Sequence, residues 1–228
     1  MVAHDNSLDA DFADIDAAPL HERRYRVQAY RNEDGTILLR GAVRDQKPGS
    51  AFFPDDPDPL TVHHMIVDIV VDPTTFVIMD ARVVMETHPH DICTVIEPHY
   101  GKLVGLSIAR GFSAKVRELF GGPRGCSHVT ALLLAMAPVA IQSMFSMNMG
   151  AGQAVDTPQR LTPEERQQRA MTLNLNTCHV WAEDGPGLQK LALGWRPGKL
   201  EYPAPALDEV RRRMGVDEAG AQPAGGRP

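Results

Sequence analysis

Hydrophobic and polar residues alternate over four stretches in the first half of the chain, which are residues 24–30, 37–44, 62–71 and 76–86. Such alternation is typical of strands with one face on a core and the other toward solvent. Asp34-Gly35 between the first two stretches is a frequent hairpin turn, and residues 72–75 (DPTT) form a turn between the last two. The pattern therefore predicts two antiparallel β-hairpins.

The third of these stretches carries two adjacent histidines. Alternation places His63 and Met65 on one face of the predicted strand and His64 on the other. Because a shift of the pairing by one residue exchanges the two faces of a strand, the pattern leaves open which histidine points inward. We expect one of the two imidazoles to face a cavity.

The longest apolar run follows a glycine-rich turn and lies within residues 121–149. Ser127 is placed to cap a helix that begins at His128. The run has no polar side, which predicts a central helix that is buried all round. The turn brings Cys126 and His128 to the helix N-terminus, where unpaired N–H groups and the positive end of the helix dipole stabilise an anion.

Shorter elements are predicted around this helix. They are a short helix within residues 94–104, a helix over 113–120 capped by Ser113, a helix capped by Thr162, a strand over 174–181 and a last element over 188–193. The order predicts an α+β fold, with an antiparallel curved sheet packed over a long central helix and additional shorter helices. We expect a disordered acidic lead (1–20), a single domain (21–211) and a disordered tail (212–228).

Composition and charge exclude several classes of partner. The formal net charge of −6 argues against nucleic acid, because binding phosphates requires a basic surface. The apolar run is short for a membrane span and is interrupted by Pro138, so no membrane partner is expected. Three cysteines and no visible secretory signal predict a cytoplasmic protein. We also expect a homodimer, because an antiparallel sheet needs its open edge or face covered.

Several motifs resemble those of the DUF2889-type bacterial domain family, which is uncharacterised. They are His63-x-Met65, the loop 89–93 (PHDIC), residues 103–106 (LVGL), residues 125–128 (GCSH) and residues 176–179 (NTCH). The resemblance runs from about Arg24 to Trp181. The chain departs from the family pattern at His64, where an acidic residue is more usual, and at Ser127, where threonine is more usual. The chain also resembles the phenylcoumaran γ-formaldehyde lyases, which act in the bacterial breakdown of lignin-derived aromatic dimers.

This second resemblance implies a lyase that opens a phenylcoumaran ring, releases formaldehyde and leaves a stilbene. Such a reaction needs a base and an acceptor for a leaving phenoxide, and it needs no cofactor or metal. Histidine titrates near neutral pH, so His63, His64 and His128 are the catalytic candidates. The candidates for binding an aromatic substrate are Tyr100, His90 and Cys126.

Other interpretations of the same residues remain open. The histidines can be structural groups held by hydrogen bonds, and the protein can be a non-catalytic module that binds a small molecule or a partner. A Cys₃His zinc site is a further alternative, with its ligands drawn from Cys93, Cys126, Cys178, His128 and His179. Cys126 beside His128 at a helix N-terminus is also a candidate nucleophile.

Overall fold

The computed structural model describes residues 8–17, 19–49, 52–150, 162–195 and 203–216. Two compact units are present, residues 1–155 and residues 156–228, whereas the sequence predicted one domain over residues 21–211. The first unit holds the sheet and the central helix, and the second holds three short α-helices. The candidate site lies entirely within the first unit.

Four strands form one antiparallel sheet in the order in which they follow along the chain. They are β1 (Glu22–Arg31), β2 (Ile37–Lys47), β3 (Leu60–Val71) and β4 (Ile78–Thr87). The sequence prediction of two hairpins is confirmed. Strands β1, β2 and β3 extend slightly beyond the alternating stretches that predicted them, whereas β4 begins two residues later than predicted and ends one residue later. Both turns are held by aspartates, with Thr36 N–H donating to Asp34 Oδ1 and Thr74 N–H donating to Asp72 Oδ1.

The two faces of the sheet differ in burial. Odd-numbered residues of β2 and β3 point inward, and Leu39, Val43, Met65 and Val67 among them are almost fully buried. Their even-numbered neighbours are half-buried or exposed. His63 is one of the odd-numbered, inward-facing residues of β3, so His63 and not His64 faces the core side.

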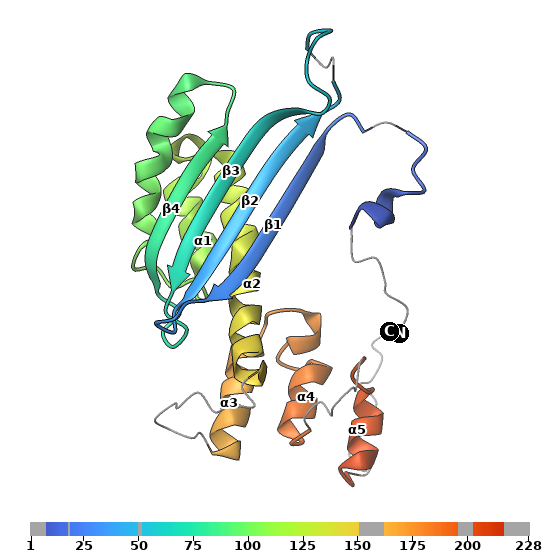
Figure 1. Ribbon diagram of the computed structural model, residues 1–228. Coiled ribbons are helices and arrows are strands. Elements are labelled where there is room, and N and C mark those ends of the chain that lie inside the picture. Colours follow the sequence, from blue (N-terminus) through green and yellow to red (C-terminus); the bar gives the residue numbers. More distant parts are fainter. Residues whose placement is uncertain (1–7, 18, 50–51, 151–161, 196–202, 217–228) are drawn as a thin grey trace, which may run out of the picture. The chain divides into compact units, whose positions relative to one another are not determined.

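Four helices of the first unit follow the sheet along the chain. They are the 3-10 helix η2 (Asp91–Leu103), α1 (Phe112–Phe120), the 3-10 helix η3 (Gly122–Arg124) and α2 (Ser127–Gly150). In Figure 1, α1 and α2 lie behind the sheet, on one of its faces. The α+β class and the curved antiparallel sheet over a long helix are therefore confirmed. The expected cap of α1 at Ser113 was wrong, because Gly111, with φ of 68°, occupies the cap position and the helix begins at Phe112.

The central helix α2 is buried along one stripe and not all round. The buried residues are Val129, Leu132, Leu133, Met136, Ala140 and Met144. Pro138 and Gln142, on other sides of the helix, are exposed. The prediction of burial on every side was wrong because the helix packs against the sheet with one side. Gly41 of β2 allows the close approach, since a Cβ atom there would stand 2.7 Å from Met136 Sδ.

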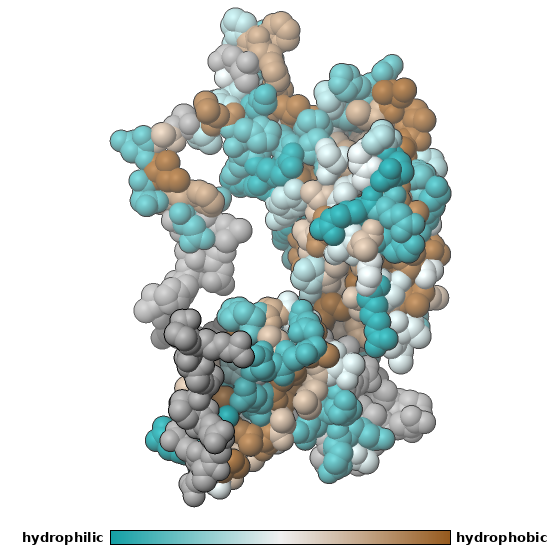
Figure 2. Space-filling model, turned by 180° about the vertical axis from the view of Figure 1, so that it is seen from behind, coloured by the Kyte–Doolittle hydropathy of each residue, from teal (hydrophilic) through white to brown (hydrophobic). Residues whose placement is uncertain are grey.

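Residues 127–144 of α2 are long and apolar enough to cross a membrane by length and composition alone, and no other such helix occurs in the described part of the chain. The core helix of a soluble protein passes the same test, and 33% of this window is buried. Figure 2 views the molecule from the side opposite to Figure 1, and brown hydrophobic residues lie there in patches between teal ones.

The second unit is built from α3 (Pro163–Asn174), the 3-10 helix η4 (His179–Trp181), α4 (Pro186–Ala192) and α5 (Leu207–Arg213). Thr162 caps α3 as predicted, in a reciprocal pair of hydrogen bonds with Glu165. The strand predicted over residues 174–181 was wrong. Asn174 O accepts from Thr177, and Asn176 N–H donates to Trp181 O, so local hydrogen bonds close this segment into a turn.

The two ends of the chain contain more helix than the sequence suggested. Within the lead, Leu8–Phe12 forms the 3-10 helix η1, and Asp9 pairs with Arg24 at 3.2 Å. Helix α5 reaches Arg213, past the start of the predicted tail. Residues 1–7 and 217–228 of the lead and tail lie outside the described residues.

Candidate functional site

A buried carboxylate lies near the end of β2. Asp45 continues the inward phase of the strand, is 1% exposed, and is the one buried charged side chain among the described residues. Arg23 of β1 stands opposite it in the strand register. Its guanidinium donates from Nε to Asp45 Oδ1 and from Nη2 to Asp45 Oδ2, both at 2.6 Å. This bidentate pair fixes the orientation of the carboxylate.

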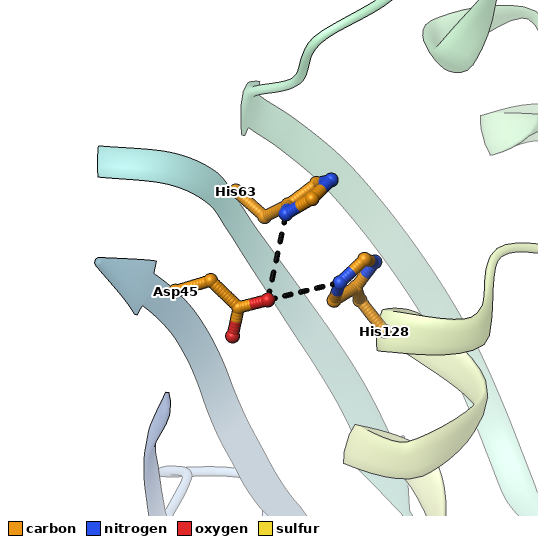
Figure 3. A group of neighbouring side chains, drawn as sticks. All are labelled: Asp45, His63 and His128. Atoms are coloured by element: carbon orange, nitrogen blue, oxygen red, sulfur yellow. Dashed lines mark hydrogen bonds and ion pairs between the residues drawn. The ribbon is translucent and has the colours of Figure 1, made fainter. Parts of the chain in front are cut away.

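Two imidazoles meet the same carboxylate from different elements. His63 is the register partner of Asp45 on β3, and its Nδ1 lies 3.4 Å from Asp45 Oδ2. His128, in the first turn of α2, brings Nε2 to 3.0 Å from the same oxygen. The two rings stack, with centroids 3.9 Å apart and planes at 27°. Figure 3 shows the carboxylate oxygen between a nitrogen of each ring, with the other nitrogen of each ring pointing away.

A third imidazole completes the surroundings of the carboxylate. His21, just before β1, places Nε2 3.7 Å from Asp45 Oδ2. The side chains become more exposed in the order His128 (14%), His63 (21%), Arg23 (37%) and His21 (42%). The cluster is therefore closed on the side of α2 and open on the side of β1.

The electrostatics keep the carboxyl ionised and the inner imidazoles neutral. Burial by itself would raise the pKa of Asp45, but the hydrogen bond and charge of Arg23, with the charges of His128 and His21, lower it below its usual value. Burial lowers the pKa of His63, and the neighbouring His128 lowers it further. Burial also lowers the pKa of His128, against the opposing effect of Asp45. A pair of neutral imidazoles beside an anion is able to accept a proton near neutral pH.

The turn before α2 holds His128 from its other side. Cys126 Sγ lies 3.6 Å from His128 Nδ1, and Cys126 N–H donates to Tyr100 Oη at 2.7 Å. Tyr100 is fully buried and stacks on Phe120, and burial raises the pKa of Tyr100 to about 12. Gly125 fits here because a Cβ atom would stand 2.5 Å from Phe120 O. Tyr100, expected to bind substrate, thus supports the turn that carries Cys126 and His128.

The remaining predicted site residues lie elsewhere. His64 points to the outer face of the sheet, opposite Arg44 of β2 in the register. His90 is exposed, and its carbonyl oxygen lies 2.8 Å from His88 Nδ1. Among the residues of the proposed Cys₃His set, Cys93 packs against the core of the first unit, and Cys178 and His179 belong to the second unit.

The structure brings together a different group of possible metal ligands. Asp45, His63 and His128 offer one ligand atom each, and these atoms lie within 4.8 Å of one another. Sequence reasoning found the two histidines but missed Asp45, Arg23 and His21. The sequence did contain a signal for Asp45. Inward-facing residues recur at every second position of β2, and Asp45 lies two residues after Val43. The predicted strand ended one residue too early to include it.

Comparison with known proteins finds a matching family model. No curated protein and no solved structure matches the chain. The model of a family described as "Protein of unknown function (DUF2889)" matches residues 21–142, which is more than half of the 228 residues. The matched span includes the sheet, Asp45 with its three histidines and Arg23, and most of α2. The chain therefore belongs to the DUF2889 family.

Proposed function

We propose that this protein is a cytoplasmic, cofactor-independent lyase that acts on a hydrophobic aromatic small molecule by histidine acid–base chemistry. In its most specific form, the substrate is a lignin-derived phenylcoumaran dimer, and the products are formaldehyde and a stilbene. One observation carries the proposal, namely the stacked pair of His63 and His128 on the ionised Asp45. The named substrate comes from the resemblance to the phenylcoumaran lyases.

The reaction requires one base and one site that stabilises a leaving oxygen. The base removes the proton of the side-chain hydroxyl, and the electrons of that O–H bond form the C=O bond of formaldehyde. The carbon–carbon bond breaks, and its electrons form the stilbene double bond as the ring ether leaves as a phenoxide. The proton taken by the base returns to the phenoxide, so atoms and charge balance without an oxidant or reductant.

His63 is the better base of the two. Its Nδ1 faces Asp45, and its second nitrogen, Nε2, points away from the carboxylate (Figure 3). His128 lies instead with one nitrogen near Asp45 and the other near Cys126. When His63 Nε2 takes the proton, the carboxylate of Asp45 stabilises the imidazolium formed 3.4 Å away.

The N-terminus of α2 is the proposed acceptor for the developing phenoxide. The N–H groups that precede Thr130 have no partner within the helix, because the first helical bond runs from Thr130 N–H to Cys126 O. Donors oriented in advance toward a developing negative charge lower the barrier to its formation. The stacked histidines stand at the same end of α2, which brings base and acceptor together.

The test is turnover of a phenylcoumaran alcohol by the purified protein, followed by formaldehyde release and stilbene absorbance. We expect His63→Gln and His128→Gln to lower kcat/KM by about 10²–10⁴-fold, the usual contribution of a general acid or base. The matched control is His64→Gln, because His64 adjoins His63 on β3 but lies on the outer face. Absence of turnover by the wild-type protein, or an equal loss in the His64 variant, contradicts the proposal.

The rival function is a binding module that uses the same residues without chemistry. Its distinguishing result is saturable binding of the phenylcoumaran alcohol, measured by calorimetry, with no formaldehyde released over many hours. The lyase predicts instead that the ligand is consumed during the titration.

A further inference from the structure

We propose that Asp45, His63 and His128 also bind one divalent transition-metal ion such as Zn²⁺, and that the bound ion switches the acid–base site off. Binding of the ion stands independently of the reaction, and the switching-off rests on the proposed function. Imidazole nitrogen and carboxylate oxygen are ligands that zinc commonly takes in proteins.

The two distances from the carboxylate oxygen to the imidazole nitrogens fit one coordination sphere, and all three ligand atoms lie within 4.8 Å of one another. Ligands held at about 2.0–2.1 Å from a tetrahedral ion stand about 3.3 Å from one another. Asp45 Oδ2 lies 3.0 Å from His128 Nε2 and 3.4 Å from His63 Nδ1. Three protein ligands leave a fourth position open, and His21 Nε2, 3.7 Å from the same oxygen on the exposed side, is within reach of it.

A buried nitrogen without a hydrogen bond gives an independent reason. Among the described residues, His63 Nδ1 is the one buried side-chain nitrogen or oxygen atom that lacks a hydrogen-bond partner. A buried polar atom without a partner destabilises the folded state unless a water, an ion or another group binds to it. A cation between His63 and the carboxylate would satisfy it, because the nitrogen would present its lone pair to the ion.

The groups around the three ligands also suit a metal. Neutral imidazole and ionised carboxylate are the forms in which histidine and aspartate bind a metal ion. Arg23 orients Asp45 through both oxygens, as outer partners of metal-binding carboxylates do. Its positive charge also weakens the attraction for a cation, which favours reversible binding over a permanent structural ion.

The ion would stop proton transfer through the tautomers that it imposes. Coordination through His63 Nδ1 requires the proton of that ring to sit on Nε2, which is the nitrogen that acts as the base. Coordination through His128 Nε2 moves the proton of that ring to Nδ1, which lies 3.6 Å from Cys126 Sγ. Both rings then lack a free basic nitrogen.

The experiment titrates full-length, chelator-treated protein with Zn²⁺ by calorimetry and with Co²⁺ by absorbance. We expect one ion per chain, and at least a tenfold loss of affinity in Asp45→Asn, His63→Gln and His128→Gln. His64→Gln keeps the wild-type affinity. The Co²⁺ spectrum shows visible bands without the intense near-ultraviolet absorption of a thiolate ligand. In the wild-type protein, imidazole ¹⁵N signals of His63 and His128 shift on adding Zn²⁺, which needs no variant to fold.

Each other outcome counts against the proposal. No binding, unchanged affinity in the His63 and His128 variants, or a thiolate spectrum overturns the site. Binding of Zn²⁺ that leaves formaldehyde release unchanged overturns the switching-off. If the metal-free protein shows no turnover at all, the lyase fails, while the calorimetric and spectroscopic results still decide the metal site.

Discussion

Four basic side chains share one buried carboxylate, and the properties of Asp45 therefore decide those of its neighbours. Arg23 binds both oxygens of Asp45, and His21, His63 and His128 approach Oδ2. Since one anion serves several potential cations, the imidazoles compete for it. The cluster is thus most stable when His63 and His128 are neutral and the carboxyl is charged.

The first prediction concerns how much the carboxylate of Asp45 contributes to the stability of the fold. Asp45→Asn should lower the free energy of unfolding by about 2 kcal/mol, because hydrogen bonds to charged groups contribute about 1.5–3 kcal/mol. Urea denaturation measures this loss of unfolding free energy. Asp68→Asn is the matched control, since Arg40 binds Asp68 with the same two-pronged geometry at 2.7 Å on the outer face. That exposed pair should contribute less to stability, because solvent screens it, and equal losses in the two variants would contradict the prediction.

The second prediction is a loss of stability in two steps as the pH falls. The pKa values of His63 and His128 are lowered by folding, so the unfolded chain binds more protons below the ordinary value of 6.5. Stability should therefore begin to fall below about pH 6.5. The lowered pKa of Asp45 removes further stability at more acidic pH, below the ordinary value of 3.8.

Denaturant midpoints in chelator-containing buffers from pH 8 to pH 3 measure this profile. In the double variant of His63→Gln and His128→Gln, the first step should shrink while the second remains. A flat profile between pH 8 and pH 5 in the wild-type protein would contradict the assignment.

At the scale of elements, the packing of α2 on the sheet positions the site. The helix starts at Ser127, beside the cluster, and its buried stripe runs along the inner face of the sheet. Gly41 sits where the two approach most closely, because a Cβ atom there would meet Met136 and Leu132. The position of His128 relative to Asp45 depends on this contact.

The third prediction tests that contact. Gly41→Ala should destabilise the protein by about 1–3 kcal/mol, the usual cost of overpacking a core, and should loosen the pairing of His128 with Asp45. Thermal and urea denaturation give the first effect, and the ¹⁵N shifts of His128 give the second. Gly101→Ala is the control, since nothing lies within 4 Å of a Cβ atom there. Equal changes in both variants would contradict the role of Gly41.

The elements themselves were predictable to different degrees. The hairpins and α2 have long periodic patterns and followed from the sequence within a few residues. The segment 174–181 has strand-like residues but forms a turn, because hydrogen bonds of Asn174 and Asn176 close it locally. The sequence of α2 does not show which side of the helix packs against the sheet, because apolar residues occur on every side of it.

At the scale of the whole molecule, the chain divides after α2. The connected hydrophobic core of the first unit draws its buried residues from Ile37 to Met144. In the second unit, α4 contacts α3 and α5, and Leu188, Leu191 and Val210 are buried. The family match ends at residue 142, inside the first unit.

The fourth prediction follows from this division. A chain of residues 1–155 should fold cooperatively and retain the histidine cluster, because its buried core ends at Met144 and the last residue packed against that core is Met147. Circular dichroism during urea denaturation measures cooperativity, and Co²⁺ binding reports the cluster. The full-length chain is the reference. A fragment that unfolds without a transition would show that the second unit contributes to the fold of the first.

The fifth prediction is a homodimer. The outer face of the sheet carries half-buried apolar residues such as Leu38, Ile66 and Val70, and no described helix of the first unit covers it. Light scattering should give twice the chain mass of 25.0 kDa. Ile66→Glu should yield a monomer with an intact site, because Ile66 lies on the opposite face from His63. A wild-type monomer at micromolar concentration would contradict this expectation.

Local sequence patterns were enough to locate the four strands of the sheet, the long helix and the residues able to carry acid–base chemistry. These depend on local periodicity, on turn residues and on the chemical nature of histidine. Which of these groups act together became visible only in the folded chain. Asp45 meets Arg23 across 22 residues and His128 across 83, and these distances in sequence are closed by strand register and helix packing. A local pattern carries no information about such contacts, because the same alternation permits either register and either face.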